Sequence, residues 1–132
     1  MKGLSARITR GMNLGAMVIV ADNSGGKIAR ITSVKGGKSR KGRQVSAGIA
    51  DLVKVSIRKG LPEMRKQLFD AIVIRQRREW RRLNGERICF SDNAIALLKD
   101  EKNPKGTMIK GPVAREVLER WPAVAKIAAT VV

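Results

Sequence analysis

The chain has 132 residues and carries 28 lysines and arginines against 11 aspartates and glutamates, a formal net charge of +17. Apolar residues make up 43% of the sequence, which excludes a disordered chain, and the length fits a single domain, residues 1–132. Histidine is absent and cysteine occurs once, which excludes histidine-based catalysis, an internal disulfide and a Cys/His metal cluster, so we expect neither an enzyme nor a cofactor.

The excess of positive charge predicts a polyanionic partner, because like charges repel one another in a compact state and attract counter-ions. The basic clusters lie in strand-like and glycine-rich contexts rather than on an amphipathic helix, which favours nucleic acid over a membrane surface. Residues 1–20 lack the apolar core of a signal peptide. We therefore expect a cytoplasmic protein without a membrane partner.

The first half of the chain is typical of β-strands separated by turns. Residues 17–21 form an apolar run, the turn-forming residues 22–26 follow, and residues 27–34 resume as a second strand. Residues 35–43, KGGKSRKGR, contain five basic residues and no acidic one, which indicates a flexible cationic loop. Residues 52–58 alternate between apolar and polar side chains, which predicts a half-buried strand with a basic outer face.

Residues 71–90, AIVIRQRREWRRLNGERICF, predict a β-hairpin that is rich in arginine. The dipeptide Asn84-Gly85 favours a type I′ turn, in which both central residues need positive φ. In that register Arg82 lies directly opposite Arg87, which destabilises the hairpin by a few tenths to about 1 kcal/mol. We therefore expect an anion such as phosphate between these two side chains.

Two side chains of this hairpin are expected to be buried. Trp80 lies on the side of its strand opposite the arginines, where packing on Cys89 across the hairpin is favoured over stacking on a base. Cys89 itself stands in an apolar run and predicts a buried thiol. With two tryptophans and two phenylalanines in the chain, no aromatic platform for single strands is expected. The expected mode is recognition of folded RNA through phosphate, sugar and shape.

Only the end of the chain predicts helix. Residues 94–98 form another apolar strand, and residues 99–106 form a loop of mixed charge. A first helix is expected to begin near Pro112 and to end at Trp121, and a second is expected to continue through Ala128. The predicted fold is therefore mainly β, a small five-stranded barrel with a projecting hairpin and short C-terminal α-helices. In this scheme residues 1–110 form the barrel, residues 71–90 the hairpin arm and residues 111–132 the helical segment.

The basic clusters are the candidate binding residues, because the planar fork of arginine matches phosphate oxygens. Clusters of one sign differ from an ordinary solvated face, which mixes both signs. The residues predicted to contact RNA are Lys38, Arg40, Lys41, Arg43, Arg58, Lys59, Arg65, Lys66, Arg75, Arg77, Arg78, Arg81, Arg82 and Arg87.

Spaced motifs along nearly the whole chain carry a resemblance to a known family. They are VADNSG at residues 20–25, AIVI at 71–74, Asn84-Gly85, Phe90, Asn93 and GPVARE at 111–116. Together they resemble the universal family of large-subunit ribosomal protein number fourteen. The extended N-terminus, REWRR at residues 78–82 and the Trp121-Pro122 ending resemble its archaeal and eukaryotic branch, with archaeal favoured. Ala96 stands where the family pattern favours valine or threonine, a conservative departure.

The resemblance implies a structural constituent of the large ribosomal subunit that binds large-subunit ribosomal RNA in the cytoplasmic ribosome. It also implies a place on the intersubunit face, beside ribosomal protein number three and the archaeal-eukaryotic protein number twenty-four, with a contact to small-subunit RNA. The C-terminal region of this branch is offered to anti-association initiation factor number six. Arg115, Glu119 and Trp121 are the residues that we assign to such protein docking.

Two other functions are compatible with parts of the sequence. A free-standing RNA-binding barrel that acts as an RNA chaperone would share the charge, although stacking aromatic residues are missing from its strands. A carboxylate-dependent RNA-processing enzyme could use Asp22 or Asp92, although the sequence shows neither histidine nor a clear acidic pair.

Overall fold

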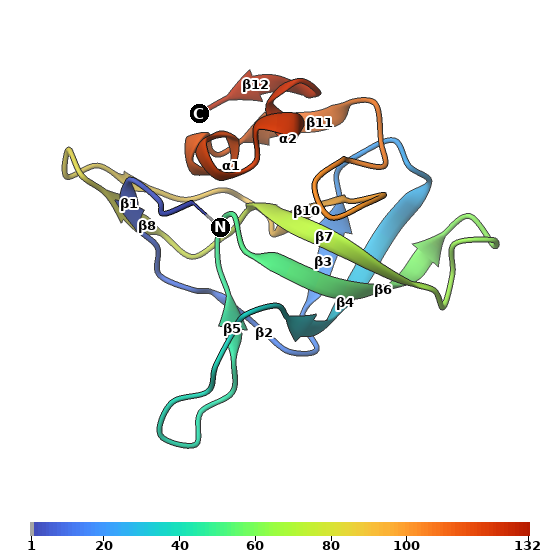
Figure 1. Cartoon of the computed structure of the whole chain (residues 1–132), viewed down its shortest axis with the longest axis horizontal. Coiled ribbons are helices and arrows are strands. Elements are labelled where there is room, and N and C mark those ends of the chain that lie inside the picture. Colours follow the sequence, from blue (N-terminus) through green and yellow to red (C-terminus); the bar gives the residue numbers. More distant parts are fainter. Residues whose placement is uncertain (1) are drawn as a thin grey trace.

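Five strands close into a barrel in the order β10-β3-β4-β6-β7 in the computed structural model, which describes residues 2–132 (Figure 1). The barrel strands are β3 (Met17–Val20), β4 (Gly26–Val34), β6 (Leu52–Gly60), β7 (Leu68–Arg75) and β10 (Ala94–Leu97). Strands β3, β4, β6 and β7 are antiparallel neighbours, and β10 closes the barrel by pairing antiparallel to β7 and parallel to β3. The predicted five-stranded barrel is confirmed.

The extent to which a strand is buried depends on whether another segment covers its outer face. In β6 the apolar residues Val53, Val55 and Ile57 point into the barrel and are fully buried, while the residues between them are partly exposed. In β7 the run Ala71–Ile74 is buried on both faces. The C-terminal segment covers this strand from outside, and the Ala114 amide donates a hydrogen bond to the Ile74 carbonyl. Consecutive burial in β7 therefore reflects the second layer that covers it.

Two smaller features extend from the barrel. Strand β2 (Met12–Asn13) pairs with β5 (Ser46–Ala47). The basic loop between β4 and β5 projects away from the barrel, on the side opposite the C-terminal helices (Figure 1). The predicted cationic loop is therefore an extended one, which presents its side chains far from the core.

The hairpin arm is a three-stranded sheet rather than a two-stranded one. It consists of β8 (Trp80–Arg82), β9 (Arg87–Ile88) and the N-terminal strand β1 (Ala6–Arg7), in the order β1-β8-β9. Figure 1 shows it projecting from one end of the barrel. The third strand was not predicted, because a strand of two residues has no recognisable alternation.

The turn of the arm differs from the predicted type I′ turn. Its loop has three residues, and of these only Gly85, with a φ of 89°, has a positive φ. The Gly85 amide donates to the Arg82 carbonyl, and the Arg82 amide donates to the Glu86 carbonyl. This is the hairpin loop that places a single glycine in the left-handed region. The register shifts by one residue as a result, so that Arg81 lies opposite Arg87.

The C-terminal segment has the architecture β-α-α-β. It comprises β11 (Ile109–Val113), α1 (Arg115–Arg120), α2 (Pro122–Ala125) and β12 (Ala128–Val131), and the two strands are parallel. The two predicted short helices are confirmed, but their predicted limits were wrong. Pro112 lies in β11 opposite Thr130, and Ala128 lies in β12. The boundary predicted at residue 110 falls inside β11, because pairing with the distant end of the chain extends this strand. Neither α1 nor α2 has the length needed to cross a membrane, and the described residues contain no helix that does.

Candidate nucleic-acid interface

Most of the predicted RNA contacts are exposed, and they gather on three projections. The β4–β5 loop, the end of β6 with the connection that follows it, and the arm leave the barrel in three different directions (Figure 1). The exposed residues are Lys38, Arg40, Lys41, Arg43, Arg58, Lys59, Arg65, Lys66, Arg77, Arg78, Arg81 and Arg87. The cationic side chains therefore lie on three separate projections around the barrel rather than on one flat basic face.

The β4–β5 loop has an ion pair at its base and unpaired cations beyond it in the described chain. Lys35 at its base pairs with Asp70 on β7, with 2.9 Å between the ammonium nitrogen and a carboxylate oxygen. Within residues 2–132, no ion pair involves the four predicted cations at 38–43. The Arg43 amide donates to the Arg40 carbonyl at 3.0 Å, which closes a local turn. The geometry leaves these cations available to a polyanion.

The second projection follows β6. Arg58 and Lys59 are exposed near the end of the strand, and Arg65 and Lys66 are exposed in the next turn. The buried Met64 anchors this turn, and the Lys66 amide donates to the Ile57 carbonyl at 3.0 Å. The four cations therefore occupy a fixed connection at the rim of the barrel.

The outer face of the arm carries arginines that lie directly opposite one another. Arg81 pairs with Arg87 on one side and with Arg7 on the other. All three side chains are exposed. The expectation of two facing arginines was right in kind but named Arg82 in place of Arg81. Sequence reasoning missed Arg7 altogether, and only the basic character of the first ten residues could have drawn attention to it.

Arg82 lies on the inner face of the arm, whereas the sequence predicted that it contacts RNA. Its Nε lies 2.7 Å from Oε1 of Glu116, and its Nη2 donates to Oε2 at 3.3 Å and to the Val132 carbonyl at 2.7 Å. Its side chain is 9% exposed. Arg82 shares the face of the buried Trp80, two residues before it on β8, and the predicted loop, which was one residue shorter, wrongly set it opposite the exposed Arg87. Its guanidinium is engaged inside the protein.

Glu116 collects the hydrogen bonds of this buried cluster. Its carboxylate accepts from Arg82 and, at 3.3 Å, from the indole nitrogen of Trp80. Burial by itself raises the pKa of the Glu116 carboxyl, but the hydrogen bonds from Arg82, the backbone and Trp80, together with the charge of Arg82, outweigh it. The net pKa lies below its ordinary value of 4.5. The carboxylate is therefore held ionised against the arm.

Arg75 also serves the interior of the protein. Its Nε and Nη2 donate to the two carboxylate oxygens of Asp92 at 2.9 and 3.1 Å. Its Nη1 donates to the carbonyls of Lys110 and Pro112, each at 2.9 Å. The residue is 7% exposed. It was predicted to contact RNA, but its guanidinium joins the end of β7 to the start of the C-terminal segment.

Of the two side chains predicted to be buried in the arm, one is buried and the other is exposed. Trp80 is buried, as predicted, but it packs on Phe90, with ring centroids 5.8 Å apart, and lies opposite Ile88 on β9 instead of the predicted Cys89. Cys89 is exposed, so the predicted buried thiol was wrong. The reason is the alternation of an extended chain, which turns Ile88 and Phe90 toward Trp80 and the residue between them outward.

The residues assigned to protein docking lie on and beside α1. Arg115 is exposed, whereas the carboxylate of Glu119 accepts a bifurcated hydrogen bond from the Ser5 hydroxyl, with its two oxygens 2.8 and 2.7 Å from Oγ. Trp121 is 8% exposed, and its indole nitrogen donates to the Ala50 carbonyl at 2.9 Å. Trp121 therefore fixes the helices to the barrel more than it offers a free surface.

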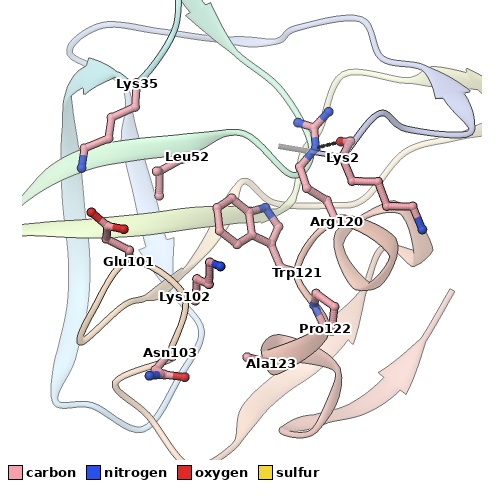
Figure 2. A pocket seen from close by; sticks show the side chains of 10 residues that line it. All are labelled: Lys2, Lys35, Leu52, Glu101, Lys102, Asn103, Arg120, Trp121, Pro122 and Ala123. Atoms are coloured by element: carbon pink, nitrogen blue, oxygen red, sulfur yellow. Dashed lines mark hydrogen bonds between the residues drawn. The ribbon is translucent and has the colours of Figure 1, made fainter.

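A cavity of about 830 Å³ opens beside Trp121. Figure 2 shows the Trp121 ring at its centre, with Arg120 and Pro122 from the helices on one side and Lys102 from the loop after β10 on the other. Its lining combines an apolar floor with charged residues of both signs.

The two carboxylates considered for an enzyme have structural partners. Asp22 is buried and accepts hydrogen bonds from the Leu97 amide at 2.8 Å and from the amide and hydroxyl of Ser24. Asp92 is the partner of Arg75. Each carboxylate therefore ties segments of the fold together.

Comparison with known proteins identifies the family. The sequence model of ribosomal protein L14p/L23e matches residues 11–132. The chain belongs to the ribosomal protein L14p/L23e family. It is similar to large ribosomal subunit protein uL14 of Nanoarchaeum equitans, with 56% identity over 133 residues and all of both chains covered. The corresponding proteins of Methanothrix thermoacetophila and Halobacterium salinarum are 49% and 45% identical over 132 residues, again with both chains fully covered.

Membership of this family fixes the general role of the chain. It is a non-enzymatic structural protein of the large ribosomal subunit and is located in the cytoplasmic ribosome. The similar proteins named above are archaeal, in agreement with the resemblance to that branch. The match to the family begins at residue 11, so the N-terminal segment that supplies β1 lies outside it.

Proposed function

We propose that the chain binds large-subunit ribosomal RNA through the exposed cations of its three projections. The observation that carries the proposal is the β4–β5 loop, which extends Lys38, Arg40, Lys41 and Arg43 away from the barrel with no acidic partner among residues 2–132. Charges in such a loop neutralise phosphates at little cost, because no internal ion pair has to be broken first. The second projection and the arm extend the same electrostatic surface around the barrel.

Recognition in this proposal rests on phosphate and shape rather than on base stacking. Trp80 and Trp121 are buried, and their indole nitrogens donate to Glu116 and Ala50 inside the protein. Neither ring is placed to stack on an unpaired base. Arginine and lysine side chains on extended loops favour contacts with the backbone of folded RNA.

A salt series with purified components tests the RNA-binding proposal. Full-length chain is titrated onto transcribed archaeal large-subunit RNA, alongside a variant with Arg40, Lys41 and Arg43 changed to glutamine. The logarithm of the binding constant should fall steeply with the logarithm of salt concentration, and the slope should decrease by up to about 3 in the variant. A flat dependence for the unaltered chain, or equal slopes for both proteins, would count against the proposed surface.

Sedimentation separates a ribosomal constituent from a free RNA chaperone. In a lysate fractionated over a salt series, the chain should stay with the large subunit at moderate salt. A predominant free pool at the top of the gradient would favour the chaperone instead. The buried tryptophans support the first alternative, because a chaperone for single strands depends on stacking platforms.

We further propose that the C-terminal face supports contacts with other components at the intersubunit side. The family resemblance suggests ribosomal proteins number three and number twenty-four, small-subunit RNA and anti-association factor number six as the partners. Figure 1 shows α1 and α2 on the side of the barrel opposite the β4–β5 loop, which leaves them accessible when RNA holds the loop. Subunits that carry Arg115→Glu should assemble normally but bind the factor or the small subunit more weakly. Unchanged binding of every one of these partners would remove this exposed arginine from the proposed face.

A further inference from the structure

The outer face of the arm contains an arginine row that no acidic residue separates. Strand register places Arg7 opposite Arg81 and Arg81 opposite Arg87. Directly opposite residues on neighbouring strands share one face, and the strands are about 4.8 Å apart. The row therefore spans about 10 Å at the level of the backbone, across the full width of the sheet.

This arrangement is unfavourable for the free protein. Like charges placed directly opposite each other destabilise a sheet, and the row contains two such pairs. A single acidic side chain relieves it, since Glu79 lies 2.8 Å from Arg87 in an exposed pair. Within the described chain, neither Arg7 nor Arg81 takes part in an ion pair. Closely spaced external anions would convert the repulsion into attraction.

Arg7 is held in place by contacts of the residues just before and just after its strand. The Ser5 hydroxyl donates to Glu119 on α1, and Gln76 donates to the Thr9 carbonyl at 2.9 Å. These contacts order the N-terminal segment before any partner binds. The segment precedes residue 11, where the match to the family begins.

We propose that Arg7, Arg81 and Arg87 form one phosphate-binding row, and that the N-terminal segment is thereby part of the RNA-binding surface. The ligand is a run of neighbouring phosphates on one RNA strand that crosses the three strands of the arm. RNA carries a charge at every nucleotide, which fits a row of cations at regular spacing, and arginine contacts phosphate through its planar fork. The inference rests on the proposed RNA-binding function and names one of its contact sites.

The test combines RNA binding with the stability of the free protein. The variants are Arg7→Gln, Arg81→Gln and the double variant, and Lys99→Gln in the exposed loop after β10 is a control that removes the same charge from outside the arm. Binding of the full-length chain to transcribed large-subunit RNA is measured over a salt series. Each single variant should reduce the salt slope by about 1, and the double variant by about 2. Thermal unfolding at low salt should show a Tm that rises by roughly 1 to 4 °C, because repulsion is relieved.

The outcomes separate this inference from the function on which it rests. Suppose that RNA binding by the unaltered chain depends steeply on salt and that Arg7→Gln keeps the full slope. The proposed phosphate-binding row is then wrong, while the proposed RNA-binding function stands. An equal loss in Arg7→Gln and Lys99→Gln would also overturn the row, since net charge alone would then explain it. Unchanged RNA binding together with weaker cross-linking to an acidic ribosomal protein would assign the row to protein. If the unaltered chain fails to bind RNA, both proposals fall.

Discussion

Arg82 on the arm and Glu116 on α1 form a buried ion pair, with 2.7 Å between Nε and Oε1 and side-chain exposures of 9% and 3%. The same guanidinium donates to the carbonyl of Val132 at the end of the chain. The arm, the helices and the C-terminus are therefore joined at one point. An arginine that the sequence placed at the RNA surface instead sets the position of the arm that carries the other arginines.

Replacing Glu116 with glutamine should destabilise the protein by about 3 kcal/mol, because it leaves the charge of Arg82 buried without its counter-ion. Urea unfolding of the free protein measures the change. Glu101→Gln is the matched control, since it removes an equal charge from an exposed loop, and it should shift stability by less than about 0.5 kcal/mol. Equal stability of the two variants would show that the pair contributes nothing beyond net charge.

The lowered pKa of Glu116 predicts a loss of stability in acid. A carboxyl whose pKa is lower in the folded than in the unfolded state stabilises the fold fully above its unfolded value. This contribution should therefore be present above about pH 4.5 and disappear as the pH falls through the lower folded pKa. Thermal unfolding of the unaltered chain and of Glu116→Gln over an acid pH series measures it. The difference in Tm between them should shrink toward low pH, and a constant difference would contradict the assignment.

The barrel could be predicted from sequence because its signals are local. The alternation of residues 52–58 and the turn residues at 22–26 each fix a strand or its end without reference to distant segments. The arm was predicted only in part. Its turn was assigned from Asn84-Gly85, a dipeptide compatible with both a two-residue and a three-residue loop, and the choice between them decides which arginine of β8 lies opposite Arg87.

Long-range pairing explains most of what the sequence did not reveal. Strand β1 forms only because β8 offers an edge, and Pro112 lies in a strand because the last residues of the chain return to pair with it. Arg75 looked like any other arginine of a basic run. Its two carbonyl partners and Asp92 come from segments that meet it only in the folded protein. The residues predicted from sequence to contact RNA therefore included two arginines, Arg75 and Arg82, that the structure places in the interior.

Arg75→Lys should destabilise the protein without changing how it binds RNA. A lysine cannot form the two parallel hydrogen bonds to Asp92 while also reaching both carbonyls, so we expect a loss of about 2 to 4 kcal/mol. Chemical unfolding measures the loss. Because a lysine would still neutralise a phosphate, the RNA test uses Arg75→Gln, for which a salt series with large-subunit RNA should give an unchanged slope. Arg77→Lys is the exposed control and should leave stability unaffected. A reduced slope with full stability would return Arg75 to the RNA surface.

Gly60 is expected to resist substitution because its φ is 148° and a Cβ at this position would lie 2.7 Å from the Gly25 carbonyl oxygen. Gly60→Ala should therefore cost about 2 kcal/mol or more. Gly36 has a φ of 71° and open space around it, so Gly36→Ala reports the backbone strain alone. Unfolding in urea should show the larger loss for the first variant. Equal losses would mean that close packing of β4 against β6 adds nothing.

Glu79 should weaken RNA binding in the unaltered protein, because it occupies Arg87 through an exposed ion pair at 2.8 Å. Exposed pairs of this kind contribute at most about 1 kcal/mol, so Glu79→Gln should leave the Tm of the free protein nearly unchanged. It frees one arginine and removes a negative charge near the expected phosphates. The affinity for large-subunit RNA at low salt should then rise by about 2- to 5-fold.

Glu86→Gln is the matched control for this change, since it removes the same charge from an exposed position in the same arm. Within the described residues Glu86 takes part in no ion pair, so its replacement should raise the affinity less than that of Glu79. Equal gains would reduce the effect to the net charge of the arm. A loss of affinity in Glu79→Gln would mean that Glu79 holds Arg87 in the orientation that RNA requires, and that the ion pair persists in the complex.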